Sequence, residues 1–198
     1  AISAALQQPR YEASPNQLSS AEIHQAADVI INATDPRYGG LKGTPKFPQA
    51  PLFTFLWEAY LRSRNEKARD AVLTTLTQIS NGGIYDHLAG GIARYSTDPK
   101  WLAPHFEKML YDNAQYVSLL TRAWLETEMP LYATRISQTI EFVLREMTGE
   151  SGCFTSSYDA DSEGKEGKYY VWSQDEIQKL LAPDEFEIFR AAYDVTAS

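Results

Sequence analysis

Long and short connections alternate between the predicted helices, and this alternation limits the folds that the chain can adopt. Apolar residues recur at helical spacing in seven segments, which predicts a helix that begins at Ser19 and further helices at 51–63, 66–80, 104–128, 131–147, 174–181 and 184–193. The connections at 63–66 and 128–131 are tight, whereas those at 35–50, 81–103 and 149–173 are long. Because successive loops of antiparallel helical hairpins emerge at opposite ends, the three long loops should share one face. That face is the candidate site of an essentially all-α protein.

The first predicted helix carries its own start signals. Ser19 and Glu22 have the spacing of a capping box, and Leu18 and Ile23 have the spacing of a hydrophobic staple. Before Leu18, two prolines and three glutamines are typical of a linker or entry segment. We therefore expect a linker at 1–17 and one folded domain at 18–198, a length that can bury a substantial core.

The charge balance narrows the class of partner. The chain has 18 basic and 26 acidic side chains and a net charge of -8, which disfavours binding to nucleic acid or to an anionic membrane surface. No apolar run approaches the roughly 20 residues of a membrane span, and the single Cys153 excludes an internal disulfide or a CxxC redox centre. We expect a cytoplasmic protein with a small neutral or cationic ligand and with neither metal nor cofactor. The first residue is alanine, so we also expect a chain that was processed or cut from a longer protein.

Each long loop contains a similar glycine-bearing stretch, at residues 38–41, 81–84 and 150–154. Glycine just past a helix end is the usual left-handed stop, and its recurrence also indicates an internal repeat of helical hairpins. In the third loop, segments 154–158 and 168–172 are predicted to form a small β-hairpin. The acids between them resemble the start of an EF-hand loop, but Tyr170 stands where that loop needs glutamate. They either line the ligand face or close the hairpin turn, and a bound cation stays an alternative.

Chemically active side chains are densest between Asn81 and Gln115, a segment that holds two of the three histidines. On a helix that starts near Pro104, His105 and Asp112 would share one stripe, roughly 10 Å apart along the axis. The helix dipole favours the neutral, base-competent form of a histidine in the first turn. We therefore predict His105 as a catalytic base and Asp112, in the same pocket, as a catalytic residue that orients the imidazole. The alternative is a histidine that caps the loop or is satisfied in the core.

Further candidates lie in this loop and in its two neighbours. His87 follows Asp86, which can orient an imidazole ring, so His87 is a second catalytic candidate. Arg94 is suited to clamp a carboxylate or a hydroxyl-rich ligand, or it holds its own loop. Aromatic rings either offer flat faces to sugar rings or fill a core. The predicted ligand-binding residues are Lys46, Asp86, Arg94, Tyr95, Trp101, Asp159, Asp161 and Trp172.

Several motifs occur in a fixed order along the chain: TPKFP at 44–48, GGIYDHLAGG at 82–91, RYS at 94–96, PHFEKMLYDNA at 104–114, DADSEG at 159–164 and YVW at 170–172. Over about residues 35–196 the sequence resembles the thioredoxin-domain-containing family that includes a spermatogenesis-associated protein. The resemblance implies a parent with a thioredoxin-like domain followed by an (α/α) toroid similar to N-acylglucosamine 2-epimerase and six-hairpin glycosidases. It implies no established activity. This chain would hold only the N-terminal part of that toroid, because seven helices cannot close a ring of twelve.

Three functional hypotheses stay open. In the first, the toroid binds a carbohydrate, and its parent is a sugar epimerase or isomerase in which His105 and His87 move a proton alpha to a carbonyl. The second is glycoside hydrolysis by two carboxylates drawn from Asp112, Asp159, Asp161 and Glu163. The third is a non-catalytic binding or scaffold module that accompanies the thioredoxin-like domain. We also expect a homo-oligomer, because the last hairpin should expose Phe186, Ile188, Phe189 and Tyr193.

Overall fold

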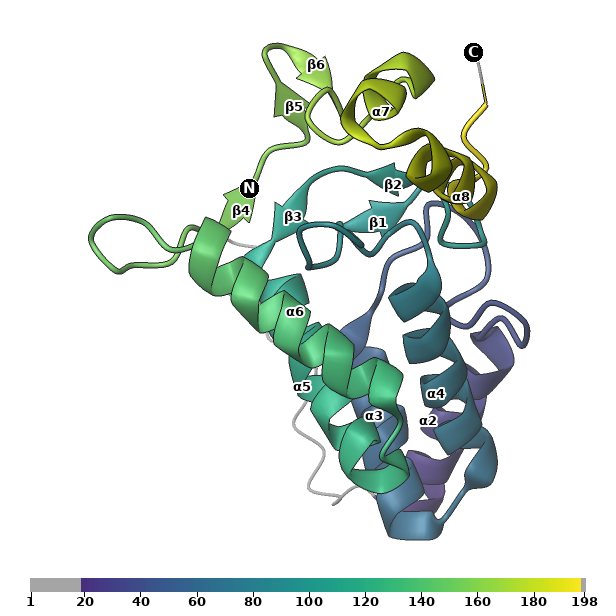
Figure 1. The fold of residues 1–198 in the computed structure, drawn as a ribbon. Coiled ribbons are helices and arrows are strands. Elements are labelled where there is room, and N and C mark those ends of the chain that lie inside the picture. Colours follow the sequence, from purple (N-terminus) through teal and green to yellow (C-terminus); the bar gives the residue numbers. More distant parts are fainter. Residues whose placement is uncertain (1–18, 197–198) are drawn as a thin grey trace, which may run out of the picture.

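The computed structural model describes residues 19–196, and in that range the protein consists of seven helices and three small antiparallel strand pairs (Figure 1). The helices are α2 (Ser20–Ala33), α3 (Ala50–Ser63), α4 (Glu66–Asn81), α5 (Leu110–Thr127), α6 (Pro130–Glu146), α7 (Gln174–Leu180) and α8 (Pro183–Tyr193). The strand pairs are β1 (Tyr95–Ser96) with β2 (Pro104–His105), β3 (Lys108–Met109) with β4 (Ser157–Tyr158), and β5 (Asp161–Ser162) with β6 (Lys165–Glu166). No helix in this range has the length and apolar character that a membrane crossing requires.

Local sequence signals explain where several helices begin and end. The predicted capping box is present in α2: the Glu22 N–H donates to the Ser19 hydroxyl, and the Ser19 N–H donates to the Glu22 carboxylate. The proposed staple residue Leu18 lies outside the described residues. Proline occupies the first turn of α3, α6 and α8, where its missing N–H leaves no helix bond unmade. The tight turns after α3 and α5 each place one residue in the left-handed conformation, Arg64 and Glu128.

The core lies between the helical hairpins α3–α4 and α5–α6. α3 contributes Phe53 and Leu56, α4 contributes Val72, and α5 contributes Leu120, all of them fully buried. Buried positions recur every three or four residues, so each helix presents one apolar stripe to its neighbours. α2 packs against both α3 and α4. Hairpins that pack side by side in this way bring every second loop to the same end.

The three long loops lie at one end of the helices, as predicted (Figure 1). They run over residues 34–49, 82–109 and 147–173, and we call this end the loop face. Two backbone hydrogen bonds between Lys46 and Ser96 join the first loop to the second, and the β3–β4 pair joins the second loop to the third. These paired backbones hold the side chains of the loop face in place.

Helix α5 starts at Leu110, later than the predicted start at Pro104. Residues 104–109 instead form β2 and β3, because their backbones pair with residues 95–96 and 157–158. His105 therefore lies in a strand and Asp112 in the first turn of α5, so the two do not share a helical stripe. The helix-dipole argument for His105 is wrong for the same reason.

The small hairpin in the third loop is present, but it has a different register from the predicted one. β5 and β6 are joined by Glu163 and Gly164, whose φ angles of 52° and 73° match the twist of a two-residue hairpin turn. The predicted pairing of 154–158 with 168–172 is wrong, because β4 pairs with β3 of the second loop. In Figure 1 the β5–β6 hairpin stands beyond β3 and β4, over the loop face.

The hairpin of α7 and α8 exposes only part of its expected apolar flank. Phe186 is buried, contrary to the expectation, whereas Ile188 and Tyr193 are exposed. Phe189 is half-buried and its ring stacks on that of Tyr193. The apolar surface available for self-association is therefore smaller than predicted, and the homo-oligomer stays a prediction.

Candidate functional site

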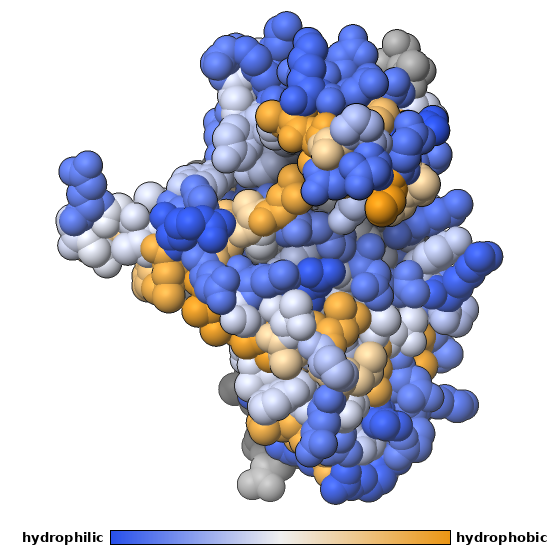
Figure 2. Space-filling view, viewed as in Figure 1, coloured by the Kyte–Doolittle hydropathy of each residue, from blue (hydrophilic) through white to orange (hydrophobic). Residues whose placement is uncertain are grey.

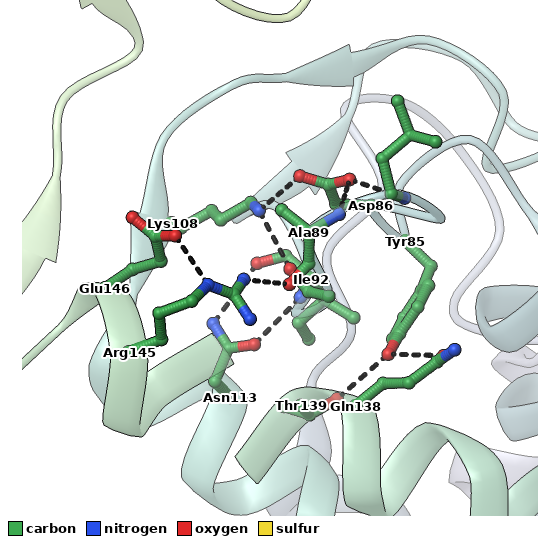
Figure 3. A network of polar contacts seen from close by, with 12 residues as sticks. Tyr85, Asp86, Ala89, Ile92, Lys108, Asn113, Gln138, Thr139, Arg145 and Glu146 are labelled. Carbon is green, nitrogen blue, oxygen red and sulfur yellow. Dashed lines mark hydrogen bonds and ion pairs between the residues drawn. The ribbon is translucent and has the colours of Figure 1, made fainter. Parts of the chain in front are cut away.

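Lys108 is a buried cation beneath the loop face. The residue is only 2% exposed, and its Nζ donates to Asp86 Oδ2 at 2.7 Å and to the Gly90 carbonyl oxygen at 2.9 Å (Figure 3). Nζ also lies 4.2 Å from the ring centroid of Phe142 and 5.2 Å from that of Tyr170, which is a cation–π arrangement. The fold thus places one ammonium group between a carboxylate and two aromatic faces.

Burial and charge pairing oppose each other in this ion pair. Burial lowers the pKa of Lys108, and the attraction of Asp86 offsets only part of that shift. Burial pushes the pKa of Asp86 upward, but Lys108 and the N–H groups of Ala89 and Leu88 outweigh it, so the pKa of Asp86 lies below its usual value. Asp86 therefore stays ionised at neutral pH and supplies the counter-charge that a buried lysine needs.

A cavity of about 350 Å³ opens beside Lys108, which lies within the size range of small-molecule sites. We call it the Lys108 cavity. Its aromatic walls are Phe142, Tyr158, Tyr169 and Tyr170. Its carboxylates are Asp86, Glu146, Asp159 and Asp161. Burial raises the pKa of Tyr170 to about 12, so this hydroxyl stays protonated at neutral pH and can donate a hydrogen bond.

A second, smaller cavity of about 180 Å³ adjoins the first. Lys108, Asp86 and Tyr170 line both cavities, so they stand between the two. The remaining walls of the smaller cavity are mostly apolar and include Ile84 and Phe106. The Lys108–Asp86 pair can therefore contact ligands on two sides.

A polar network behind the cavity fixes the loop that carries Asp86 (Figure 3). The side chain of Asn113, which is fully buried in α5, accepts the Ile92 N–H at 2.8 Å and donates to the Ile92 and Met109 carbonyl oxygens. Arg145 on α6 donates to the Ala89 carbonyl oxygen at 2.8 Å. The bonds from Asn113 satisfy the buried N–H and carbonyl groups of Ile92. Together with the exposed bond from Arg145, they hold residues 85–92 against α5 and α6.

His87 uses both of its ring nitrogens in structural contacts. Arg135 donates to Nδ1 at 3.0 Å, and a guanidinium can only donate. Nδ1 therefore carries no proton, and Nε2–H donates to the Gly82 carbonyl oxygen at 2.9 Å. Asp86, the predicted orienting residue, faces Lys108 instead. In this geometry His87 has no free lone pair with which to act as a base.

Within the range that the structure describes, His105, in contrast to His87, uses only one of its ring nitrogens in a hydrogen bond. Its Nδ1 lies 2.6 Å from a carboxylate oxygen of Glu166, and its ring stacks on Tyr95 with 4.7 Å between centroids. Because an ionised carboxylate only accepts, Nδ1 carries the proton of the neutral ring, and Nε2 makes no hydrogen bond within residues 19–196. The structure thus replaces Asp112 by Glu166 as the partner of His105. Neither His105 nor Tyr95 lines the two cavities.

Arg94 and Asp112 lie in a separate charged cluster. Arg94 donates to Glu107 at 2.6 Å, so it holds its own loop. Burial raises the pKa of Asp112 to about 6 although Arg94 opposes the shift. Asp112 Oδ2 is buried and finds no hydrogen-bond partner in the described part of the chain. Neither residue lines the Lys108 cavity or its smaller neighbour.

Lys46 and Trp101 are buried residues that join the first two loops. Lys46 Nζ donates to the Pro99 carbonyl oxygen at 3.0 Å and lies 3.7 Å from Asp35 Oδ2. Trp101 is fully buried, and its Nε1–H donates to the Tyr38 carbonyl oxygen at 2.7 Å. Neither side chain offers a surface on which a ligand could lie.

The remaining predicted ligand residues lie near the Lys108 cavity. Asp159 and Asp161 are exposed and line its rim, together with Asp86 at its base. Trp172 lines a neighbouring hollow of about 300 Å³. Among the described residues, no group of three or more His, Cys, Asp and Glu side chains has a metal-binding arrangement. The structure therefore brings three predicted residues to the Lys108 cavity, His87 to its smaller neighbour and Trp172 to the adjoining hollow. The other predicted residues line none of the three.

Lys108, Phe142 and Tyr158, which line the Lys108 cavity together with the predicted Asp86, are not singled out by sequence reasoning. Lysine is seldom buried, so Lys108 has the pattern of a surface charge. Phe142 and Tyr158 have the pattern of core or strand residues. The one available signal is the position of Lys108 between apolar and aromatic neighbours in the motif HFEKMLY at 105–111.

The fold that these hairpins define is part of an (α/α) toroid, with a loop face at one end. A crystal structure of a sugar epimerase from a ruminal bacterium is similar, with a TM-score of 0.61. The similarity covers 81% of this chain and 47% of the epimerase chain at 15% sequence identity. At this identity the likeness establishes the fold alone.

The chain is homologous to part of spermatogenesis-associated protein 20. It is 41% identical to the mouse protein and 40% identical to the human protein over 157 residues, which are 74% of this chain and 20% of each relative. An uncharacterized protein of Caenorhabditis elegans is 32% identical over 184 residues, 83% of this chain and 25% of that protein. No protein-family model matches the chain. The chain thus spans about a fifth to a quarter of the length of these relatives.

Proposed function

We propose that the chain binds a carbohydrate in the Lys108 cavity. A cavity of about 350 Å³ with a buried ammonium group at its base, aromatic walls and carboxylates at its rim carries this proposal. The C–H faces of a sugar ring can pack on aromatic rings, and its hydroxyl groups can bond to charged side chains. Lys108 donates two hydrogen bonds within the protein, so its third proton can serve a ligand oxygen.

The charges of the cavity favour a hydroxyl-rich ligand over a polyanion. Lys108 is already paired with Asp86 at 2.7 Å. The rim carboxylates of Asp159 and Asp161 form no ion pair with a basic side chain within residues 19–196. A phosphate or a second carboxylate would meet these charges at close range, which is unfavourable. Hydroxyl groups, in contrast, can donate to the carboxylates.

The reaction that we propose for a bound sugar is epimerisation or isomerisation. The likeness to a sugar epimerase supports it at the level of the fold. His105 is the candidate base, because Glu166 fixes its Nδ1–H and leaves Nε2 to accept a proton from the carbon alpha to a carbonyl. Since His105 lines neither the Lys108 cavity nor its smaller neighbour, it could act only on a part of the ligand that extends beyond them. Asp112, with a pKa raised to about 6 by burial, is the candidate acid that returns a proton, and it too lies outside the two cavities. His87 would first have to release Arg135 before it could take part.

Two other functions have their own support. The raised pKa of Asp112 is the property of a general acid in glycoside hydrolysis. A non-catalytic module is supported by the structural contacts of His87, Arg94 and Lys46. In that case residues 18–198 are the first part of a toroid in a longer, cytoplasmic protein, and the toroid accompanies a thioredoxin-like domain.

A titration with neutral mono- and disaccharides tests carbohydrate binding, with heat of binding or a thermal shift as the readout. Asp161→Ala removes an exposed rim carboxylate and leaves the Lys108–Asp86 pair intact. Asp184→Ala is the matched control, because Asp184 is exposed on α8 outside the cavity. We expect saturable binding that the first variant weakens and the second does not. Absence of saturable binding to any sugar in the wild-type chain would overturn the proposal.

A further inference from the structure

We infer, resting on the proposed carbohydrate binding, that the Lys108 cavity is one subsite of a longer groove and that the ligand is an oligosaccharide. One short segment, residues 168–172, contributes side chains to three hollows of the loop face. Their volumes are about 180, 350 and 300 Å³. A segment that lines three hollows can contact successive units of a chain-like ligand.

The three hollows adjoin through shared side chains. Tyr170 lines both the smaller cavity and the Lys108 cavity. Tyr169 and Ser162 line both the Lys108 cavity and the third hollow, and Trp172 lines only the third. The Lys108 cavity is therefore the middle one of the three. A single sugar ring on Lys108 cannot also fill the third hollow, whereas a chain of linked rings can occupy both.

The outer end of this groove exposes aromatic rings that the core does not use. Trp172 is 49% exposed and Tyr169 is 68% exposed, whereas Trp57 and Trp101 are almost fully buried. Nearby, the surface over β5–β6 is hydrophilic (Figure 2). Exposed rings in such a surface leave apolar area in contact with water. A sugar ring that stacks on Trp172 would cover that area.

The third hollow also offers polar partners for hydroxyl groups. Glu163 and Lys168 form an ion pair there, and Ser162 and Glu176 line the same hollow. The combination of an exposed indole ring with acceptors and donors around it repeats the chemistry of the Lys108 cavity. We therefore assign Trp172 and Tyr169 as the platform of an outer sugar subsite.

Calorimetric titration of the full 198-residue chain with glucose and with its β-1,4-linked and α-1,4-linked trisaccharides tests this assignment. Trp172→Ala removes the proposed platform. Trp124→Ala is the matched control, because Trp124 is also partly exposed, at 38%, but lies on α5 outside the three hollows. We expect one trisaccharide to bind at least roughly tenfold more tightly than glucose, the scale of one aromatic stacking contact. Trp172→Ala should remove this advantage, so that the variant binds the trisaccharide about as tightly as it binds glucose.

The results of the titration distinguish the outer subsite from carbohydrate binding in the Lys108 cavity. If glucose binds and no trisaccharide binds more tightly, or if Trp172→Ala weakens both sugars equally, the outer subsite is refuted while carbohydrate binding stands. If neither glucose nor any trisaccharide binds, carbohydrate binding itself is refuted and the outer subsite with it. A loss of the trisaccharide advantage in Trp124→Ala would also refute the assignment, since that ring lies away from the groove.

Discussion

Lys108 Nζ lies 2.7 Å from Asp86 Oδ2, although 22 positions separate the two residues and their side chains are only 3% and 15% exposed. A buried ion pair is weak evidence for stability, because the cost of removing both charges from water approaches the gain from pairing them. This pair instead fixes position: it ties the loop that carries Asp86 to strand β3. Both side chains also line the Lys108 cavity and its smaller neighbour.

Lys108→Met should destabilise the protein by about 3–5 kcal/mol, because it leaves Asp86 buried without its counter-charge. Urea unfolding at neutral pH measures this difference. The double variant Lys108→Met with Asp86→Asn should be less destabilised than the sum of the two single variants, because the unpaired charge is gone and the amide can still accept the N–H groups of Leu88 and Ala89. Additive effects would show that the two side chains do not interact.

His87 and His105 should show opposite neutral tautomers. Arg135 donates to Nδ1 of His87, so its proton belongs on Nε2. Glu166 accepts from Nδ1 of His105, so its proton belongs on that atom. Nitrogen chemical shifts of the two rings at pH 8 distinguish the forms. Glu166→Ala, which removes the acceptor, should alter the tautomer balance of His105 alone, and an unchanged spectrum would remove Glu166 from its orienting role.

The helices and the shared end of the long loops are predictable because both follow from local patterns. Capping residues and apolar spacing act within one helix, as at Ser19 and Glu22. Alternating loop lengths then fix which ends meet. The strands at 104–109 are not predictable in this way, because their conformation depends on backbone partners at 95–96 and at 157–158.

The site is less predictable than the fold, because its central residue, Lys108, is buried by residues that are far from it in the sequence. Nothing near Lys108 in the sequence indicates that Asp86 and Phe142 surround its ammonium group. Conversely, Trp101 has an aromatic ring on which a ligand could stack. Contact with Tyr38 and Lys46 buries that ring. Residue type indicates which chemistry a side chain can perform, whereas long-range contacts decide whether a ligand can reach it.

Asp112→Asn should stabilise the protein at pH 7.5 but not at pH 4. Burial raises the pKa of Asp112 to about 6, above the value of about 3.9 expected in the unfolded chain. The folded carboxyl group is therefore harder to ionise, and stability is lost as the pH rises from about 4 to about 6. Removing that cost should gain about 1–3 kcal/mol at pH 7.5, after allowance for the partial exposure of the side chain.

Urea unfolding at the two pH values measures the Asp112 effect against Asp28→Asn, a substitution of an exposed acid on α2. Because both substitutions remove one negative charge, the difference between them excludes the general effect of net charge on the free energy of unfolding. If Asp112→Asn has the same pH dependence as the control, the raised pKa does not contribute to stability.

Gly167→Ala and Gly164→Ala should differ although both residues have nearly the same backbone conformation, with φ of 72° and 73°. Alanine in this left-handed region costs about 1–2 kcal/mol at either position. At Gly164 the added methyl group meets no atom within 4 Å, whereas at Gly167 it would lie 2.5 Å from the ring of Phe106. That ring stacks on Tyr170 with 5.1 Å between centroids.

Gly167→Ala should therefore lose about 1–3 kcal/mol more than Gly164→Ala, the usual cost of overpacking. It should also weaken sugar binding, because a displaced Phe106 moves Tyr170, which lines both the smaller cavity and the Lys108 cavity. Urea unfolding and the near-ultraviolet circular dichroism of the tyrosines measure the two effects. Equal stabilities and equal spectra for the two variants would mean that the β5–β6 hairpin does not rest on Phe106. The groove proposed beside Tyr169 and Trp172 would then lack a fixed wall.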